Sequence, residues 1–174
     1  AEAVSVGVRG PGELMLMYGS TIFIIEVTSA PVRDARLWYA PWLMAGLHAS
    51  MSGLATSGTL IRWFRDELAP GAGWEELVAA AEASPKGAKG LLCLPHFSGE
   101  RTPIHDPFAK GVFAGMDLTH TRADLFRAVL EGIAAGTAYT LDTYREVGAA
   151  PRIVYAVGGG TQNPVWLQAT SDLG

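Results

Sequence analysis

The sequence of 174 residues has one cysteine, little charge and no long apolar run. Because Cys93 is alone, no disulfide can form within the chain, which fits a reducing compartment. No apolar stretch reaches the roughly 18 residues that a membrane helix needs, and no basic, apolar leader is present, so we expect a soluble, cytoplasmic protein. A net charge of −4 with scattered Lys and Arg argues against nucleic acid or a membrane surface as the main partner.

Several catalytic signatures are also missing. There is no G-x-S-x-G elbow and no G-x-x-x-x-G-K-[ST] loop, so serine hydrolases and P-loop proteins lack their main support. The four histidines (His48, His96, His105 and His120) show no metal-ligand spacing, and structural or surface roles fit them better than ligation. No aspartate stands at the tip of a convincing strand beside a glycine turn. We therefore expect the chain to hold an incomplete active site with no metal ligands.

What the chain does have is apolar sequence in alternating strand and helix patterns. Hydrophobic residues make up 49% and charged residues 17%, which predicts about one well-packed domain. Leu14–Tyr18 and Thr21–Val27 are strand-like, and the short turn Gly19-Ser20 predicts an antiparallel hairpin. We also expect a strand at Ala3–Val8 and irregular chain over Ser29–Pro41. Further short strands are predicted at Leu91–Leu94, with Cys93 as a buried packing residue, and at Val112–Ala114.

Three segments have helical spacing of their apolar residues. Helices are predicted over Leu54–Leu68, Trp74–Ala83 and Thr121–Val147, ended by Pro70, Pro85 and Gly148 respectively. Gly132 and Gly136 inside the longest helix each cost about 1 kcal/mol relative to alanine, so we expect a close contact on that face. Strands that alternate with helices predict an α/β fold, and the early hairpin makes its sheet mixed.

The most informative stretch is Val157–Leu173, which opens with V-G-G-G-T-Q-N-P-V-W. It follows an apolar run, Ile153–Val157, that we expect to be a buried strand, and it leads into a helix that opens at Pro164. A strand that breaks into glycines before a helix offers backbone N–H groups to a nucleotide. Gly158, Gly160 and Asn163 give G-x-G-x-x-N instead of the dinucleotide fingerprint. Asn163 is expected to hydrogen-bond a ligand or to cap the helix.

Other candidate positions each have a plain structural alternative. Gly19-Ser20-Thr21 offers hydroxyls and N–H groups to phosphate oxygens, or forms only a tight turn. Gly58 and Arg62, one helical turn apart, offer a backbone edge and a cation to a nucleotide; in the structural alternative, Arg62 is simply a solvated surface residue. Ser98–Pro103 is either a binding loop or a loop held by a network around Glu100 and Arg101.

Together these segments resemble the FGGY family of carbohydrate kinases, specifically its carboxy-terminal lobe. Gly111–Met116, followed by Asp124–Ala128 and Leu130–Gly132, is similar to the family's second signature. Ser98–Pro103 resembles its xylulokinase branch, and Leu16–Thr21 its phosphate-contacting hairpin. The glycines 158–160 resemble the adenosine-binding turn.

The resemblance implies a ribonuclease-H-like, actin-like ATPase lobe with a mixed sheet flanked by helices. Residues 1–174 would form the nucleotide-binding lobe of a sugar kinase, truncated at both ends. By similarity, Ser20 lies near the terminal phosphates of ATP, Gly58 near the nucleotide, and Gly159 and Asn163 around the adenosine. Arg62 would also lie at the nucleotide, at a position that is glutamine in glycerol kinases.

The implied reaction is ATP-dependent, Mg²⁺-assisted phosphorylation of a sugar hydroxyl, with a pentulose such as xylulose as substrate. The family's catalytic aspartate would fall upstream of Ala1, and Glu2 is not a substitute, so the chain alone is expected to be inactive. Homodimers are common among such kinases, although no patch in this sequence marks an interface. The alternatives are a non-catalytic actin-like nucleotide-binding module and a dinucleotide-binding domain.

Overall fold

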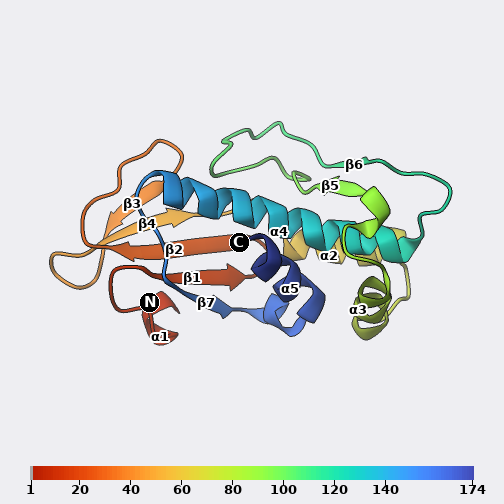
Figure 1. Cartoon of the computed structure of the whole chain (residues 1–174), viewed down its shortest axis with the longest axis horizontal. Helices are drawn as coiled ribbons and strands as arrows, with labels where there is room; N and C mark the ends of the chain where they lie inside the picture. Colours follow the sequence, from red (N-terminus) through yellow and green to blue (C-terminus); the bar gives the residue numbers. More distant parts are fainter. Residues whose placement is uncertain (1) are drawn as a thin grey trace.

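A computed structural model describes residues 2–174, and the centre of the fold is a mixed sheet (Figure 1). Its five strands lie in the order β3-β4-β2-β1-β7. They are β1 (Glu13–Tyr18), β2 (Ile22–Thr28), β3 (Trp38–Pro41), β4 (His48–Ser52) and β7 (Ile153–Val157). Neighbours among the first four strands are antiparallel, whereas β7 runs parallel to β1. The predicted mixed α/β sheet is therefore confirmed.

Helices flank this sheet, and a small second sheet lies beside them. The helices are α1 (Glu2–Ser5), α2 (Gly58–Trp63), which continues as a π-helical turn (Phe64–Leu68), α3 (Trp74–Ala83), α4 (Arg122–Glu146) and α5 (Pro164–Leu173). Two 3-10 turns cover Ala88–Gly90 and Gly159–Gln162, and β5 (Leu92–Leu94) pairs with β6 (Val112–Ala114). Within residues 2–174, none of the helices has the length and apolar character needed to cross a membrane.

The hairpin of β1 and β2 forms as its sequence predicts. Tyr18 pairs with Ile22, so the turn between the strands holds residues 19–21. Leu14, Leu16 and Tyr18 alternate along β1 and are all buried against the helices. Because successive side chains of a strand point to opposite faces, Met15 packs instead into the cluster on the other face. The tip of this hairpin later forms one wall of the candidate site.

The long helix α4 lies lengthwise across the sheet (Figure 1). It begins with a capping box in which Thr121 and Asp124 exchange side-chain and backbone hydrogen bonds. A Cβ atom added to Gly132 would stand 2.2 Å from the carbonyl oxygen of Cys93, and one on Gly136 would stand 2.9 Å from Leu54 Cδ2. Both glycines therefore allow the close contacts that their sequence positions predict.

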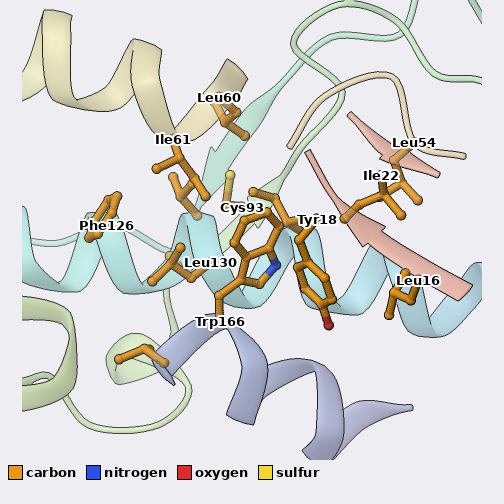
Figure 2. Close-up of a cluster of buried hydrophobic side chains, with 14 of the residues drawn as sticks. Leu16, Tyr18, Ile22, Leu54, Leu60, Ile61, Cys93, Phe126, Leu130 and Trp166 are labelled. Carbon is orange, nitrogen blue, oxygen red and sulfur yellow. The ribbon is translucent and has the colours of Figure 1, made fainter. Parts of the chain in front are cut away.

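The main hydrophobic core fills the space between the sheet and the helices α2, α4 and α5 (Figure 2). Cys93 is buried in this core, as predicted, and burial raises the pKa of its thiol to about 12. The thiol is therefore neutral and unreactive at physiological pH. A smaller cluster covers the opposite face of the sheet, and Ala3 and Val8 contribute to it from the start of the chain.

Several sequence predictions about elements are wrong. The strand expected over Ala3–Val8 does not form: its start belongs to the short helix α1, and Ala3 and Val8 pack on the second face of the sheet. Part of the segment expected to be irregular forms β3, because β4 supplies it with a hydrogen-bonded partner. The helix expected from Leu54 begins only at Gly58. In β7, which was expected to be buried, Ile153 and Val154 are 50% and 47% exposed because it is the outer strand of the sheet.

Candidate functional site

A pocket of about 840 Å³ opens where the β1–β2 hairpin, α2, α3 and the turn between β7 and α5 meet. Ser20, Gly58, Arg62, Gly159 and Asn163 all belong to its lining, so the structure brings together every residue predicted to contact a nucleotide. The remaining lining residues are Tyr18, Gly19, Ile61, Trp74, Glu75, Val78, Ala79, Glu82, Gly160, Gln162 and Trp166. A volume of this size is typical of small-molecule sites in proteins.

One wall of the pocket is the tip of the hairpin, held by the start of α2. The backbone N–H of Gly58 donates to the carbonyl oxygen of Gly19 at 3.1 Å, and those of Ser57 and Thr59 donate to Ser20 O at 3.2 and 3.1 Å. The hydroxyls of Ser57 and Thr59 bond the same two carbonyl groups at 2.9 and 3.0 Å. These donors at the start of α2 are therefore already occupied by the hairpin.

This geometry changes the interpretation of Gly58. The sequence suggested that Gly58 offers a backbone edge to the nucleotide, but its N–H is committed to Gly19. A Cβ atom at Gly58 would stand 2.5 Å from Gly19 O, so glycine is required for the hairpin to touch α2. By contrast, Ser20 is exposed at the tip, and its hydroxyl makes no hydrogen bond to other side chains or backbone groups of residues 2–174. Ser20 is the polar group that this wall presents.

The opposite wall is the glycine turn between β7 and α5. Gly158 has φ +100°, a conformation that favours glycine, and a Cβ there would also collide with Tyr18 O at 2.6 Å. A Cβ at Gly160 would stand 2.4 Å from the indole of Trp166, so this glycine makes room for a buried ring. Gly159 differs from both, because a Cβ there meets nothing within 4 Å. The fold itself does not require glycine at position 159.

Asn163 caps helix α5, as one of its two predicted roles required. Its Oδ1 accepts a hydrogen bond from the backbone N–H of Trp166 at 3.1 Å, and Pro164 occupies the first helical position. Within residues 2–174 the side-chain NH₂ group of Asn163 makes no hydrogen bond, so it remains available as a donor at the pocket.

Tyr18 and Trp166 form the floor between the two walls. Their rings meet edge to face with centroids 4.9 Å apart, and Figure 2 shows them pointing toward one another from β1 and α5. Trp166 is 2% exposed, and burial raises the pKa of the Tyr18 phenol, which therefore stays neutral. This rigid aromatic pair fixes the glycine turn relative to the hairpin.

The third wall of the pocket is one face of α3, and none of its residues was predicted from the sequence to belong to the site. Trp74, Val78 and Glu82 follow one another at four-residue intervals along it, and Arg65 lies over the Trp74 ring at 4.3 Å. Arg62 is exposed and forms no ion pair within residues 2–174. The sequence does contain one sign of this wall. Trp74 and Val78 are apolar residues of α3 that are not among its buried residues, Leu77 and Ala81.

The site has few groups for acid–base or metal chemistry. The only carboxylates in the lining are Glu75 and Glu82, both on α3. Glu2 does not line the pocket. It lies in α1, where the next residue, Ala3, packs on the opposite face of the sheet. In the part of the chain that the structure describes, no group of three or more His, Cys, Asp or Glu is arranged to hold a metal ion.

A second cavity of about 720 Å³ lies between α3, α4 and α5. Its cations are already satisfied: Arg127 bonds Glu131 Oε1 at 2.7 Å and the carbonyl oxygens of Ala81 and Ser84 at 2.9 and 3.0 Å. Lys86 pairs with Asp172 at 2.7 Å. Among residues 2–174, this cavity between the helices therefore offers no unpaired cation to a ligand.

A mixed sheet flanked by helices, with a glycine-lined pocket at one end of its central strands, defines the lobe of an actin-like ATPase. The model of the FGGY family of carbohydrate kinases, C-terminal domain, matches residues 14–173, and the chain belongs to this family. Both the predicted fold class and the predicted family are thereby confirmed.

The similar proteins include several xylulose kinases. The chain is 31% identical to the xylulose kinase of Bacillus subtilis over 173 residues, which cover 98% of this chain and 35% of that protein. It matches the crystal structure of xylulose kinase from Rhodospirillum rubrum with 37% identity and a TM-score of 0.92, again over 98% of this chain and 35% of that one. Plasmodium falciparum glycerol kinase with ADP has the same fold (TM-score 0.86, 22% identity, 97% of this chain and 35% of that one). The chain thus spans about a third of the length of these relatives.

Proposed function

We propose that residues 1–174 form the nucleotide-side lobe of a kinase that transfers the terminal phosphoryl group of ATP to a hydroxyl of a sugar, in the class of xylulose. The observation that carries this proposal is the shared pocket. Ser20, Gly58, Arg62, Gly159 and Asn163 come from three separated segments of a chain of the FGGY family, and all of them line it.

The pocket has two chemically different ends. The hydroxyl of Ser20 would donate to the terminal phosphates, on a hairpin tip whose carbonyl groups are turned toward α2. At the other end, the backbone of Gly159 and the NH₂ group of Asn163 would face the adenosine, with α3 as the far side of a slot for a flat base. Arg62, which has no ionic partner in residues 2–174, would add positive charge near the nucleotide.

Phosphoryl transfer depends on positioning and on neutralising charge, and less on covalent chemistry by the protein. Mg²⁺ would supply that neutralisation when bound. The described residues offer it no cluster of carboxylates, so phosphate oxygens and water would provide most of its ligands. This chain's share is then to hold and orient the nucleotide. The group that accepts the proton of the sugar hydroxyl would come from the amino-terminal lobe.

The substrate class follows from the relatives. Xylulose kinases recur among the similar proteins, although the gluconokinase of Bacillus subtilis is also 28% identical over 175 residues. We therefore place a pentulose such as xylulose first and a sugar acid second. Residues that select between them would lie in the amino-terminal lobe.

Calorimetric titration of the 174-residue chain with MgADP, with NAD as the control, tests the nucleotide site. Saturable binding of MgADP without NAD binding would support the kinase lobe, whereas binding of NAD would contradict it in favour of a dinucleotide-binding domain. Turnover is tested by coupled ADP release across a panel of pentuloses. We expect no activity from this chain alone and activity once the amino-terminal lobe is joined to it. Nucleotide binding with no turnover in the joined protein would favour a non-catalytic actin-like module.

A further inference from the structure

The loop that precedes Pro103 buries a carboxylate against backbone N–H groups. Glu100 is only 6% exposed, and its Oε1 accepts a hydrogen bond from the N–H of Ala55 at 2.8 Å. The other oxygen lies 3.0 Å from Nδ1 of His96. Of the predicted network around Glu100 and Arg101, the structure contains the Glu100 part: Glu100 Oε1 also accepts from the backbone N–H of Arg101 at 2.7 Å, whereas the Arg101 side chain bonds no group of residues 2–174. The loop does not line the pocket.

A second side chain of the same loop holds the same stretch of backbone. Thr102 is fully buried, and its hydroxyl oxygen accepts from the N–H of Gly53 at 2.6 Å and donates to the carbonyl of Gly53 at 3.1 Å. On its other side Gly53 touches β2, since a Cβ there would stand 2.5 Å from Ile22 O. The connection from β4 to α2, residues 53–57, is thus fixed between this loop and the start of β2.

The same connection carries the donors that hold the hairpin tip. Ser57, Gly58 and Thr59 follow it directly, and their N–H groups bond the carbonyl oxygens of Gly19 and Ser20. Any shift of residues 53–57 would therefore move the wall that presents Ser20 to the pocket. The glycine turn and α3, which form the other walls, have no part in this chain of contacts.

We propose that Glu100 and Thr102 are positioning residues for the phosphate end of the nucleotide pocket. They act through the connection at residues 53–57 on Gly58 and the hairpin tip, and they touch no nucleotide themselves. This assignment rests on the proposed function. It gives the Ser98–Pro103 motif a role in placing phosphate and not in contacting substrate.

The first test compares two nearly isosteric substitutions of fully buried threonines. Thr102→Val removes the hydroxyl that holds Gly53, whereas Thr137→Val removes one that bonds only the carbonyl of Ile133 in its own helix. Affinities for MgADP and for adenosine are measured on the 174-residue chain. Thr102→Val should weaken MgADP binding about tenfold, the size of one lost buried hydrogen bond, and leave adenosine binding unchanged. Thr137→Val should change neither affinity.

Equal changes in the two affinities of Thr102→Val, or no change in either, would overturn the positioning role while the parent chain still binds both ligands. A parent chain that binds neither ligand would instead overturn the proposed function, and this assignment with it. The ratio of the two affinities is the decisive quantity, because general destabilisation would affect both ligands alike.

A second measurement needs no ligand. In Glu100→Ala the amide hydrogens of Ser57, Gly58 and Thr59 should exchange with solvent faster than in the parent. Glu100→Gln should restore most of the protection, because its amide oxygen can still accept from Ala55. Unchanged exchange at these three amides in Glu100→Ala would show that the loop does not hold the hairpin wall, and would refute the proposal.

Discussion

Two adjacent glycines, Gly159 and Gly160, should separate nucleotide binding from folding when each is changed to alanine. Their surroundings differ sharply. A Cβ at Gly160 would stand 2.4 Å from Trp166 Cζ3 and 2.8 Å from Tyr18 Cβ, whereas one at Gly159 meets nothing within 4 Å. Both positions line the pocket, so ligand proximity alone does not distinguish them.

The expected magnitudes follow from these distances. Overpacking of a rigid core costs about 1–3 kcal/mol, so Gly160→Ala should lower the free energy of unfolding by that amount. Gly159→Ala adds its methyl group in open space and restricts the unfolded chain, which should leave stability unchanged or raise it by up to about 1 kcal/mol. That methyl group would, however, hold a base away from the backbone of the turn. We expect at least a tenfold loss of MgADP affinity.

Urea unfolding followed by tryptophan fluorescence gives the stability of each variant, and calorimetric titration with MgADP gives its affinity. Gly159→Ala that binds MgADP as tightly as the parent would refute the placement of adenosine on this turn. Gly160→Ala with undiminished stability would refute the argument that Trp166 requires a glycine there.

Substitutions at three further positions test other parts of the structure. Asn163→Ala should lower the free energy of unfolding by about 1 kcal/mol because the helix cap is lost, whereas Asn163→Asp should keep the cap. Both variants should bind MgADP more weakly, because both lose the NH₂ donor. Glu26 is 1% exposed, and burial raises the pKa of its carboxyl to about 7, so the free energy of unfolding should fall by up to about 3 kcal/mol as the pH rises from 4.5 to 7. Glu26→Gln should abolish that slope in urea titrations at a series of pH values. Gly132→Ala should destabilise the chain by at least about 1–3 kcal/mol in the same assay, because its Cβ would stand 2.2 Å from the Cys93 carbonyl oxygen.

The elements that could be predicted from sequence are those with strong local signals. The hairpin at Gly19, the long helix that Thr121 caps, and the passage from β7 into α5 each contain their own periodicity and turn residues. β3 and β4 lack such signals. His48–Ser52 is a strand because β2 pairs with it along its length, which is a long-range contact that no window of sequence contains.

The N-terminal segment shows the opposite error. Ala3–Val8 has enough apolar residues to indicate a strand, yet its start forms the short helix α1. Ala3 and Val8 both pack on the sheet face that also buries Met15. The apolar pattern predicted correctly that these residues are buried, but not the conformation that buries them.

The residues of the candidate site likewise divide into those with a local sequence signal and those placed by long-range contacts. Apart from Arg62, which lies within α2, the residues predicted to contact a nucleotide are a serine, glycines and an asparagine at turns or at the start of a helix, because such positions have recognisable sequences. The wall on α3 could not be found that way, since its position depends on α4. Arg127 of α4 donates to the carbonyl oxygens of Ala81 and Ser84 at the end of α3, and Ser84 bonds Asp124 at 2.7 Å. Those partners are about 40 residues apart in sequence.

The same limit applies to the meaning of each glycine. Spacing alone treats Gly158, Gly159 and Gly160 as one motif, but the structure gives two of them packing or conformational duties that any ligand-free fold would need. Gly159 has no such duty. The fold would accept a side chain at Gly159, which lines the pocket. Close approach of a ligand to the backbone is therefore the remaining physical reason for glycine at this position. Substitution of Gly159 therefore tests nucleotide binding more directly than substitution of Gly158 or Gly160, because changes at those two glycines would also disturb the fold.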